Sequence, residues 1–129
     1  MVPGDFIDTF LLGMYVMHPS LLPKYRGACP IQHAILNRDS ETGVSVIEIS
    51  KDRFDAGKIL AQTRVPLTPE TRFDQLSPQL SALGGQLLAN ICKDDQKLTE
   101  YKKNAVEQAT LGKSTRAPLL KGSFGEIIF

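Results

Sequence analysis

Residues 17–27 (MHPSLLPKYRG) place one histidine, two prolines, a serine and two cations within a single short stretch. The apolar run before it, 13–17, is typical of a buried strand that ends at His18. Pro19 and Pro23 cannot belong to a central strand, so we expect the chain to leave the sheet there. Because an imidazole titrates near neutral pH, His18 at a strand end is a candidate acid, base or electrostatic group.

A carboxylate is the second candidate. Asp55 lies in the polar stretch 51–57, between two β-branched segments, and Ala56 and Gly57 follow it. A histidine and a carboxylate at neighbouring strand ends can share a hydrogen bond that orients the imidazole and stabilises its charged form. Gly57 would allow a turn with positive φ, or the close approach of a ligand. Spacing alone leaves the plain alternative equally open, in which Asp55 is a solvated turn residue and His18 a core residue.

The elements that must position these residues follow from periodicity and turn residues. The patterns predict helices over 3–12 and 28–37, strands over 14–18, 43–49 and 58–66, and a long helix capped by Thr71. That helix carries one apolar stripe: Phe73, Leu76, Leu80, Leu83, Leu87 and Ile91. Pro78 should kink it or delay its start, and Gly84 and Gly85 should weaken it or let it pack close to a neighbour. The two strands around Asp55 predict an antiparallel pair.

Composition is that of an ordinary globular protein of 129 residues, with 42% hydrophobic and 22% charged residues. A net charge of +1 argues against a broadly basic nucleic-acid coat and leaves a local basic patch open. Cys29 and Cys92 have no ligand spacing, so we expect reduced thiols and no metal site. No apolar run reaches ~18 residues, so we expect no membrane span, and the first residues show no targeting segment. Three strands would leave a sheet edge unpaired, which predicts the distal part of a larger domain.

Five motifs of the chain resemble methionyl-tRNA formyltransferases, in the same order and with matching gaps. They are His18–Pro23 (HPSLLP), Arg26-Gly27, Pro30–Gln32 (PIQ), Thr42–Val46 (TGVSV) and Asp55–Leu60 (DAGKIL). The phrase RFDAGKILAQ is closer to the mitochondrial or eukaryotic branch than to the bacterial one. The SLLP loop with a downstream D-x-G is shared by the wider family of folate-dependent formyltransferases and hydrolases, so it is more specific for 10-formyltetrahydrofolate chemistry than for tRNA.

The resemblance implies an α/β fold in three parts: the C-terminal half of a Rossmann-like catalytic domain over 1–93, a polar linker over 94–116, and the start of a β-barrel tRNA-binding domain over 117–129. It implies that the amine of methionyl-tRNA attacks the formyl carbon of 10-formyltetrahydrofolate. A tetrahedral oxyanion would form and collapse to formyl-methionyl-tRNA and tetrahydrofolate, with no metal.

The site residues carried over by the resemblance are few. His18 would stabilise the oxyanion and move protons, and Asp55 would orient and charge His18. Ser20, Leu21, Leu22 and Pro23 match the loop that lines the folate site. Arg26 could help to bind an anionic part of either substrate. The implied partners are initiator methionyl-tRNA and folate, with no membrane. We expect a monomer in the mitochondrial matrix, with the targeting segment absent from this chain.

One departure from the family pattern concerns Val16. The family has an asparagine two residues before the histidine, on the same face of that strand. Valine has no donor for a developing oxyanion, and one lost donor costs about 2.7–4 kcal/mol of transition-state stabilisation. Two alternatives therefore stay open: a truncated, non-catalytic remnant of the family, or a formyltetrahydrofolate enzyme with another acceptor.

Overall fold

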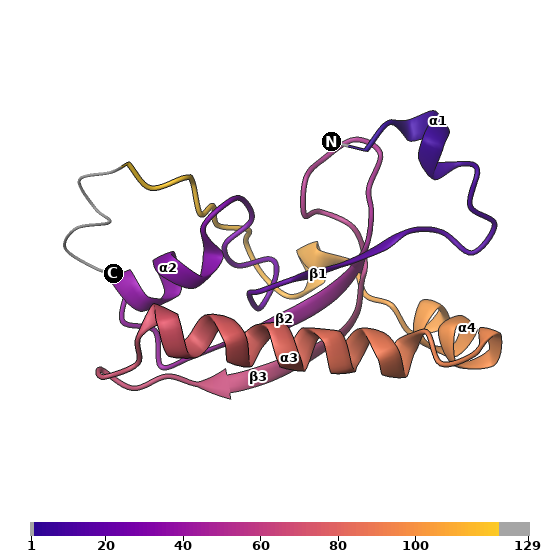
Figure 1. Ribbon diagram of the computed structural model, residues 1–129. Helices are drawn as coiled ribbons and strands as arrows, with labels where there is room; N and C mark the ends of the chain where they lie inside the picture. The colour runs from indigo at the N-terminus through magenta and orange to yellow at the C-terminus, as the bar shows by residue number, and fades with distance from the viewer. Residues whose placement is uncertain (1, 122–129) are drawn as a thin grey trace.

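The computed structural model describes residues 2–121, which form a small antiparallel sheet with helices packed around it (Figure 1). In chain order the elements are α1 (Gly4–Ile7), β1 (Tyr15–His18), α2 (Pro30–Leu36), β2 (Glu41–Glu48), β3 (Ile59–Pro66), α3 (Phe73–Ile91), α4 (Asp95–Lys103) and a 3-10 turn, η1 (Gln108–Thr110). The predicted strands and the helices over α2 and α3 are confirmed, with ends displaced by one or two residues. The strand-like piece expected over 124–129 lies outside the described residues.

The sheet has the order β1-β2-β3, and both pairings are antiparallel. The predicted antiparallel pair around Asp55 is therefore confirmed as β2 and β3. In the β1–β2 register His18 lies opposite Ser45 and Val16 opposite Ile47. A register shift between Val46 and Ile47 interrupts the β2–β3 ladder. Central strand β2 thus carries the position opposite the candidate histidine.

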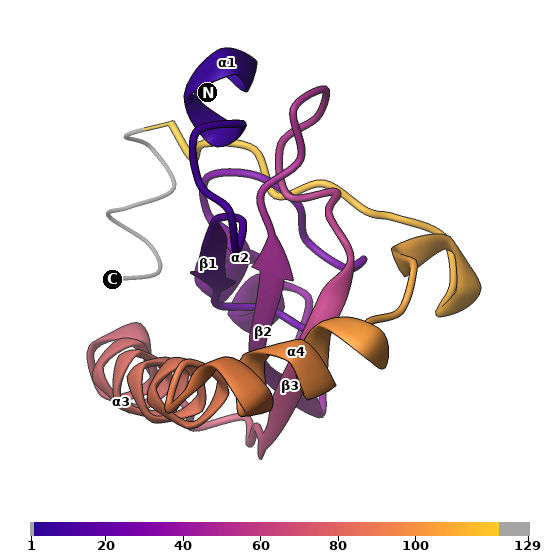
Figure 2. The same cartoon turned by 90° about the vertical axis from the view of Figure 1, so that its right-hand side faces the viewer.

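The two faces of β2 have different neighbours. Val44 and Val46 point to the face covered by α3, where Leu76, Leu80 and Ile91 complete the core. Figure 2 shows α3 and α4 together along one side of the strands. Ile47, on the other face, packs with Ile59 of β3 and with Leu22 of the loop after β1. Because side chains alternate along a strand, one strand serves both the core and the candidate site.

Helix α3 uses the predicted stripe: Leu76, Leu80 and Ile91 are buried. It runs through Pro78, so the helix start is not delayed. A Cβ atom added at Gly84 would lie 2.5 Å from Cγ of Met17, so of the two readings the structure favours close packing against β1. The predicted cap at Thr71 is wrong. Arg72 precedes the helix without a capping side chain, and Thr71 Oγ1 instead accepts from the Thr68 amide at 2.9 Å.

The helix predicted over 3–12 is wrong in its length, because α1 comprises only four residues. Ile7 is its buried residue, whereas Phe6, Phe10 and Leu11 are 50%, 45% and 99% exposed. Phe6 and Phe10 contact each other edge to face, with ring centroids 5.3 Å apart. A short helix depends on packing of its apolar face for most of its stability, and here that face has little to pack against.

Residues 94–116 have more regular structure than a polar linker predicts. Asp94 caps α4 by accepting from the Lys97 amide at 2.7 Å, and Leu98 packs in the core with Val46, Leu60 and Ile91. The polar composition reflects the solvent-facing side of an amphipathic helix. The division of the chain into domains stays a prediction.

A three-residue segment further on, 115–117, is hydrogen-bonded to the loop after β1, and we call it the strap. Arg26 donates its amide to Thr115 O at 2.9 Å, and its carbonyl accepts from the Ala117 amide at 2.7 Å. Ala117 is fully buried. None of the helices within 2–121 is long and apolar enough to cross a membrane.

Candidate functional site

His18 and Asp55, thirty-seven positions apart in the sequence, meet at one end of the sheet. His18 Nδ1 lies 3.5 Å from Asp55 Oδ1, a distance suited to an ion pair and longer than a good hydrogen bond. His18 Nε2 lies 2.9 Å from the carbonyl oxygen of Tyr25. Because a carbonyl only accepts, Nε2 must carry a proton. Nδ1, facing the carboxylate, is therefore the ring atom that can take or release a second one.

The Asp55 side chain is held by more than the histidine. Its Oδ2 accepts from the Gly27 amide at 2.9 Å, which ties the β2–β3 loop to the loop after β1. Asp55 itself has φ of 55°, a left-handed conformation that aspartate tolerates better than most residues. Gly57 serves close approach, since a Cβ atom there would overlap the carbonyl oxygen of Glu48. The group that approaches Gly57 closely is thus the backbone of β2, whereas one of the possibilities left open by the sequence was a ligand.

The loop with the expected folate contacts is fixed by a buried hydroxyl. Ser45 is fully buried, and its Oγ donates to Ser20 O at 2.6 Å and accepts from the Leu22 amide at 3.1 Å. Gln62 adds a bond from Nε2 to the same hydroxyl at 2.9 Å and another to Leu22 O at 3.0 Å. The Leu22–Pro23 peptide bond is cis. The central strand and β3 therefore set the shape of this loop.

The four predicted folate-site residues lie differently in that loop. Ser20 and Leu22 are buried, with Ser20 Oγ donating to Lys24 O at 2.6 Å. Leu21, Leu22 and Pro23 line a cavity of ≈ 400 Å³ together with residues of β2 and β3. Their role in folate binding stays a prediction.

Val16 lies on the same strand face as His18, two residues before it, and is 39% exposed. It lines a mainly apolar cavity of ≈ 360 Å³ with Ile47, Ile49, Phe54 and Asp55. A residue at this position is thus beside the His18–Asp55 pair, as the strand alternation predicted. Valine at this position supplies no hydrogen-bond donor from its own side chain.

A second cavity, of ≈ 760 Å³, also borders Asp55, and its charged lining comprises three arginines, Arg26, Arg53 and Arg116, against two aspartates, Asp52 and Asp55; we call it the cationic cavity. Burial foremost, and then repulsion from Arg53 and Arg116, lowers the pKa of Arg26, while Asp55 opposes this shift. Both cavities contain Arg53, Phe54 and Asp55 in their walls. Asp55 therefore lines both a mainly apolar space and one in which arginines outnumber carboxylates.

Gln108 was not predicted as part of the site. It is 2% exposed and lies in η1, within the stretch expected to be a linker. Its side chain donates to the carbonyl oxygens of Asp55 and Gly57 and accepts from Arg26. Nothing in the local sequence around this glutamine distinguishes it, because its partners lie 51 to 82 residues away.

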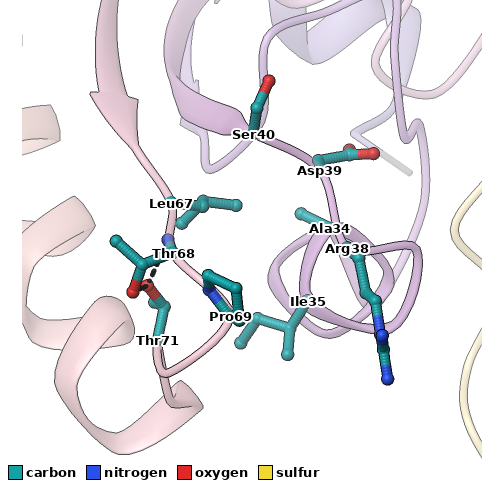
Figure 3. Close-up of a pocket in the computed structure, with 9 residues that line it drawn as sticks. All are labelled: Ala34, Ile35, Arg38, Asp39, Ser40, Leu67, Thr68, Pro69 and Thr71. Atoms are coloured by element: carbon teal, nitrogen blue, oxygen red, sulfur yellow. Dashed lines mark hydrogen bonds between the residues drawn. The ribbon is translucent and has the colours of Figure 1, made fainter.

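Another cavity, of ≈ 420 Å³, lies between the end of α2 and the loop from β3 to α3. Figure 3 shows its walls, where Ile35, Leu67 and Pro69 face one another and Arg38 points outward. Its acidic residue, Asp39, is already bonded to Lys24 and Tyr25. This hollow contains neither His18 nor Asp55, so we place the candidate chemistry at the sheet end. Across residues 2–121, no group of three or more histidines, cysteines or carboxylates is placed to hold a metal ion.

The sequence was compared with known proteins. Residues 1–92 match the sequence family described as formyl transferase. The chain is 38% identical over 118 residues to the mitochondrial methionyl-tRNA formyltransferase of Bos taurus, covering 92% of this chain and 29% of that protein. It is 45% identical over 87 residues to the methionyl-tRNA formyltransferase of Lactobacillus johnsonii, and this match covers 67% of this chain and 27% of that protein. The chain thus spans less than a third of the length of these relatives.

Solved structures give the same fold. The phosphoribosylglycinamide formyltransferase of Bacillus halodurans aligns with a TM-score of 0.61 at 28% identity, over 67% of this chain and 44% of that one. The N-formyltransferase of Helicobacter canadensis was solved with folinic acid and dTDP-3-aminofucose. It aligns with a TM-score of 0.66 at 24% identity, over 81% of this chain and 37% of that one.

Proposed function

Since the chain belongs to the formyl transferase family, we propose that it carries the second half of a methionyl-tRNA formyltransferase site and acts in formyl transfer from 10-formyltetrahydrofolate to the amine of initiator methionyl-tRNA. The observation that carries the proposal is the approach of His18 Nδ1 to Asp55 Oδ1 at 3.5 Å, with Asp55 in the walls of both the apolar and the cationic cavity. A histidine fixed in this way can transfer protons beside a reacting carbonyl.

The geometry suggests a role for each atom. Tyr25 O fixes Nε2 as protonated, so proton transfer falls to Nδ1. In formyl transfer the attacking amine must lose a proton as the tetrahedral oxyanion collapses. Nδ1 would take that proton, the Asp55 carboxylate would stabilise the resulting imidazolium, and the same proton would pass to N10 of tetrahydrofolate as its bond to the formyl carbon breaks. The Gly27 amide holds Asp55 in place for this task.

The two cavities suit the two substrates. The apolar cavity, with Val16, Ile47 and Phe54, offers walls for a flat heterocyclic ring such as that of folate, and Leu22 of the predicted folate loop packs against its Ile47. The arginines of the larger cavity are suited to the phosphates of an acceptor RNA. Because both cavities include Asp55, a donor in one and an acceptor in the other would meet at the His18–Asp55 pair.

Binding of folinic acid, a stable formyl-folate, tests the folate part directly. Ligand at about 100 times its Kd should stabilise the chain by about 2.7 kcal/mol, which for this size raises Tm by about 10 °C. The Val16→Asp variant is the matched control, because a carboxylate in the apolar cavity should abolish this shift. Formyl transfer from 10-formyltetrahydrofolate to methionyl-tRNA is the second measurement. Absence of both binding and transfer in the unmodified chain would refute the proposal.

A second acceptor class remains a candidate because of the solved relatives. The Bacillus halodurans protein is named for phosphoribosylglycinamide, and the Helicobacter canadensis protein was solved with a nucleotide-linked amino sugar. The three arginines would suit those phosphates as well. Competition between the acceptors in one transfer assay separates the two candidates. The mitochondrial relatives further suggest a mitochondrial location, which imaging of a tagged full-length protein would test.

A further inference from the structure

Every hydrogen-bond donor and acceptor of the Gln108 side-chain amide has a partner. A glutamine amide has two N–H donors and two lone pairs on its oxygen. Here Nε2 donates to Asp55 O at 2.7 Å and to Gly57 O at 2.9 Å. Oε1 accepts from Arg26 Nε at 3.0 Å and from Arg26 Nη2 at 2.8 Å. With 2% exposure, water has little access to replace these bonds.

These four bonds join three parts of the site. The donor side holds the turn that carries Asp55 in its left-handed conformation, φ 55°. The acceptor side holds the guanidinium of Arg26, whose backbone is paired with the strap. Glutamine suits this place because glutamate lacks the donors, lysine lacks the acceptor, and asparagine is one methylene shorter.

We propose that Gln108 is a positioning residue for formyl transfer: it fixes the Asp55 turn against His18 and at the same time fixes Arg26 in the wall of the cationic cavity. The relevance of Gln108 to catalysis rests on the function proposed above, whereas its positioning of Asp55 and Arg26 can be tested without an activity assay. Gln108 touches neither His18 nor a reacting atom. It acts through Asp55, whose Oδ2 in turn accepts from the Gly27 amide.

Two variants separate the two sides of the amide. Gln108→Glu keeps acceptors for Arg26 and places carboxylate oxygens against the carbonyls of Asp55 and Gly57. Gln108→Met keeps the length of the side chain and removes all four bonds. Gln79→Glu, the same chemical change at an exposed position of α3, is the matched control.

Amide hydrogen exchange of the whole chain, followed residue by residue by NMR, gives the readout. Exchange of the Gly27 amide should rise about 10-fold or more in both Gln108 variants, since its acceptor Asp55 loses its support. The amides of Asn37 and Leu76, bonded within α2 and at the start of α3, should change far less. Gln79→Glu should change none of the three.

A uniform rise at Gly27, Asn37 and Leu76 would mean that Gln108 contributes only global stability, and the proposal would be overturned. An unchanged Gly27 amide in Gln108→Glu would overturn it as well. Folinic acid binding to the unmodified chain is measured in parallel. If the chain binds no folate and Gly27 still responds selectively, the proposed function fails and the positioning of Asp55 stands. If folate binds and the exchange response is uniform, the proposed function survives and the role of Gln108 does not.

Discussion

Replacement of Ser45 by alanine removes the hydroxyl that fixes the loop after β1. Ser45 is fully buried and pairs in the sheet with His18. In Ser45→Ala the Leu22 amide loses its acceptor and the Ser20 carbonyl loses its donor, whereas Gln62 keeps its bond to Leu22 O. The substitution therefore leaves two backbone groups without these partners and creates only a small void.

The magnitude follows from those two groups. A buried polar group left without a partner costs about 1–3 kcal/mol, so the pair should lower the free energy of unfolding by about 2–6 kcal/mol. For 129 residues, an unfolding entropy of about 2.1 cal/mol/K per residue makes 1 kcal/mol equal to about 4 °C in Tm. The expected decrease in Tm is about 8–24 °C.

Thermal unfolding followed by far-UV circular dichroism measures this decrease. Ser81→Ala, on the exposed face of α3, is the control and should change Tm by less than about 2 °C. Folinic acid affinity should fall in Ser45→Ala even at temperatures where the variant is fully folded, because the loop is no longer held by β2. A change in Tm as small as that of the control would show that the loop does not depend on this hydroxyl.

Three further predictions concern separate parts of the site. Val16→Asn should raise the rate of formyl transfer about 100- to 1000-fold by supplying an oxyanion donor, and an unchanged rate in a folded variant that binds folinic acid would contradict the role assigned to this position. Gly57→Ala should lower the free energy of unfolding by about 1–3 kcal/mol, because the added Cβ would overlap the Glu48 carbonyl oxygen. Gly85→Ala should raise it by about 0.5–1 kcal/mol, because no atom lies within 4 Å of the added Cβ. Equal effects of the two substitutions in urea titrations would refute this comparison. Burial raises the pKa of the Tyr25 phenol above its value in the unfolded chain, about 10. The protonated phenol therefore contributes its full stability below about pH 10, and this contribution is lost as pH rises from there through the pKa of the folded state. Urea unfolding at pH 9 and pH 11 should show this loss, and Tyr25→Phe should reduce it without abolishing it, because a hydrogen bond to Asp39 also raises the pKa of Lys24.

Local patterns predicted the elements whose residues are both periodic and buried. The alternation in β2 and the apolar stripe of α3 were sufficient, because Val44, Val46, Leu76 and Leu80 meet in one core. The same approach overestimated α1. Phe6 and Phe10 have helical spacing, yet spacing alone does not show whether a partner surface exists.

The candidate site was predictable where it depends on strand ends and not where it depends on long-range hydrogen bonds. His18 ends an apolar strand and Asp55 lies in the loop between the next two, so their approach was one of two open interpretations, and the resemblance to formyltransferases favoured it. The contributions of Ser45, Gln62 and Gln108 could not, because each bonds to groups 17 to 82 residues away. Polar residues in a strand or a polar stretch look the same whether they face water or a buried backbone group.

The central strand has a consequence for how the protein can fail. The side chains of Val44 and Val46 pack in the interior, and the Ser45 hydroxyl bonds to the loop after β1. A slip of β2 by one residue would put a valine where the loop needs a hydroxyl and a serine where α3 needs a valine. Assembly of the hydrophobic interior and shaping of the candidate site are therefore a single event for this chain, and a misregistered molecule would lose the packed core and the fixed loop together.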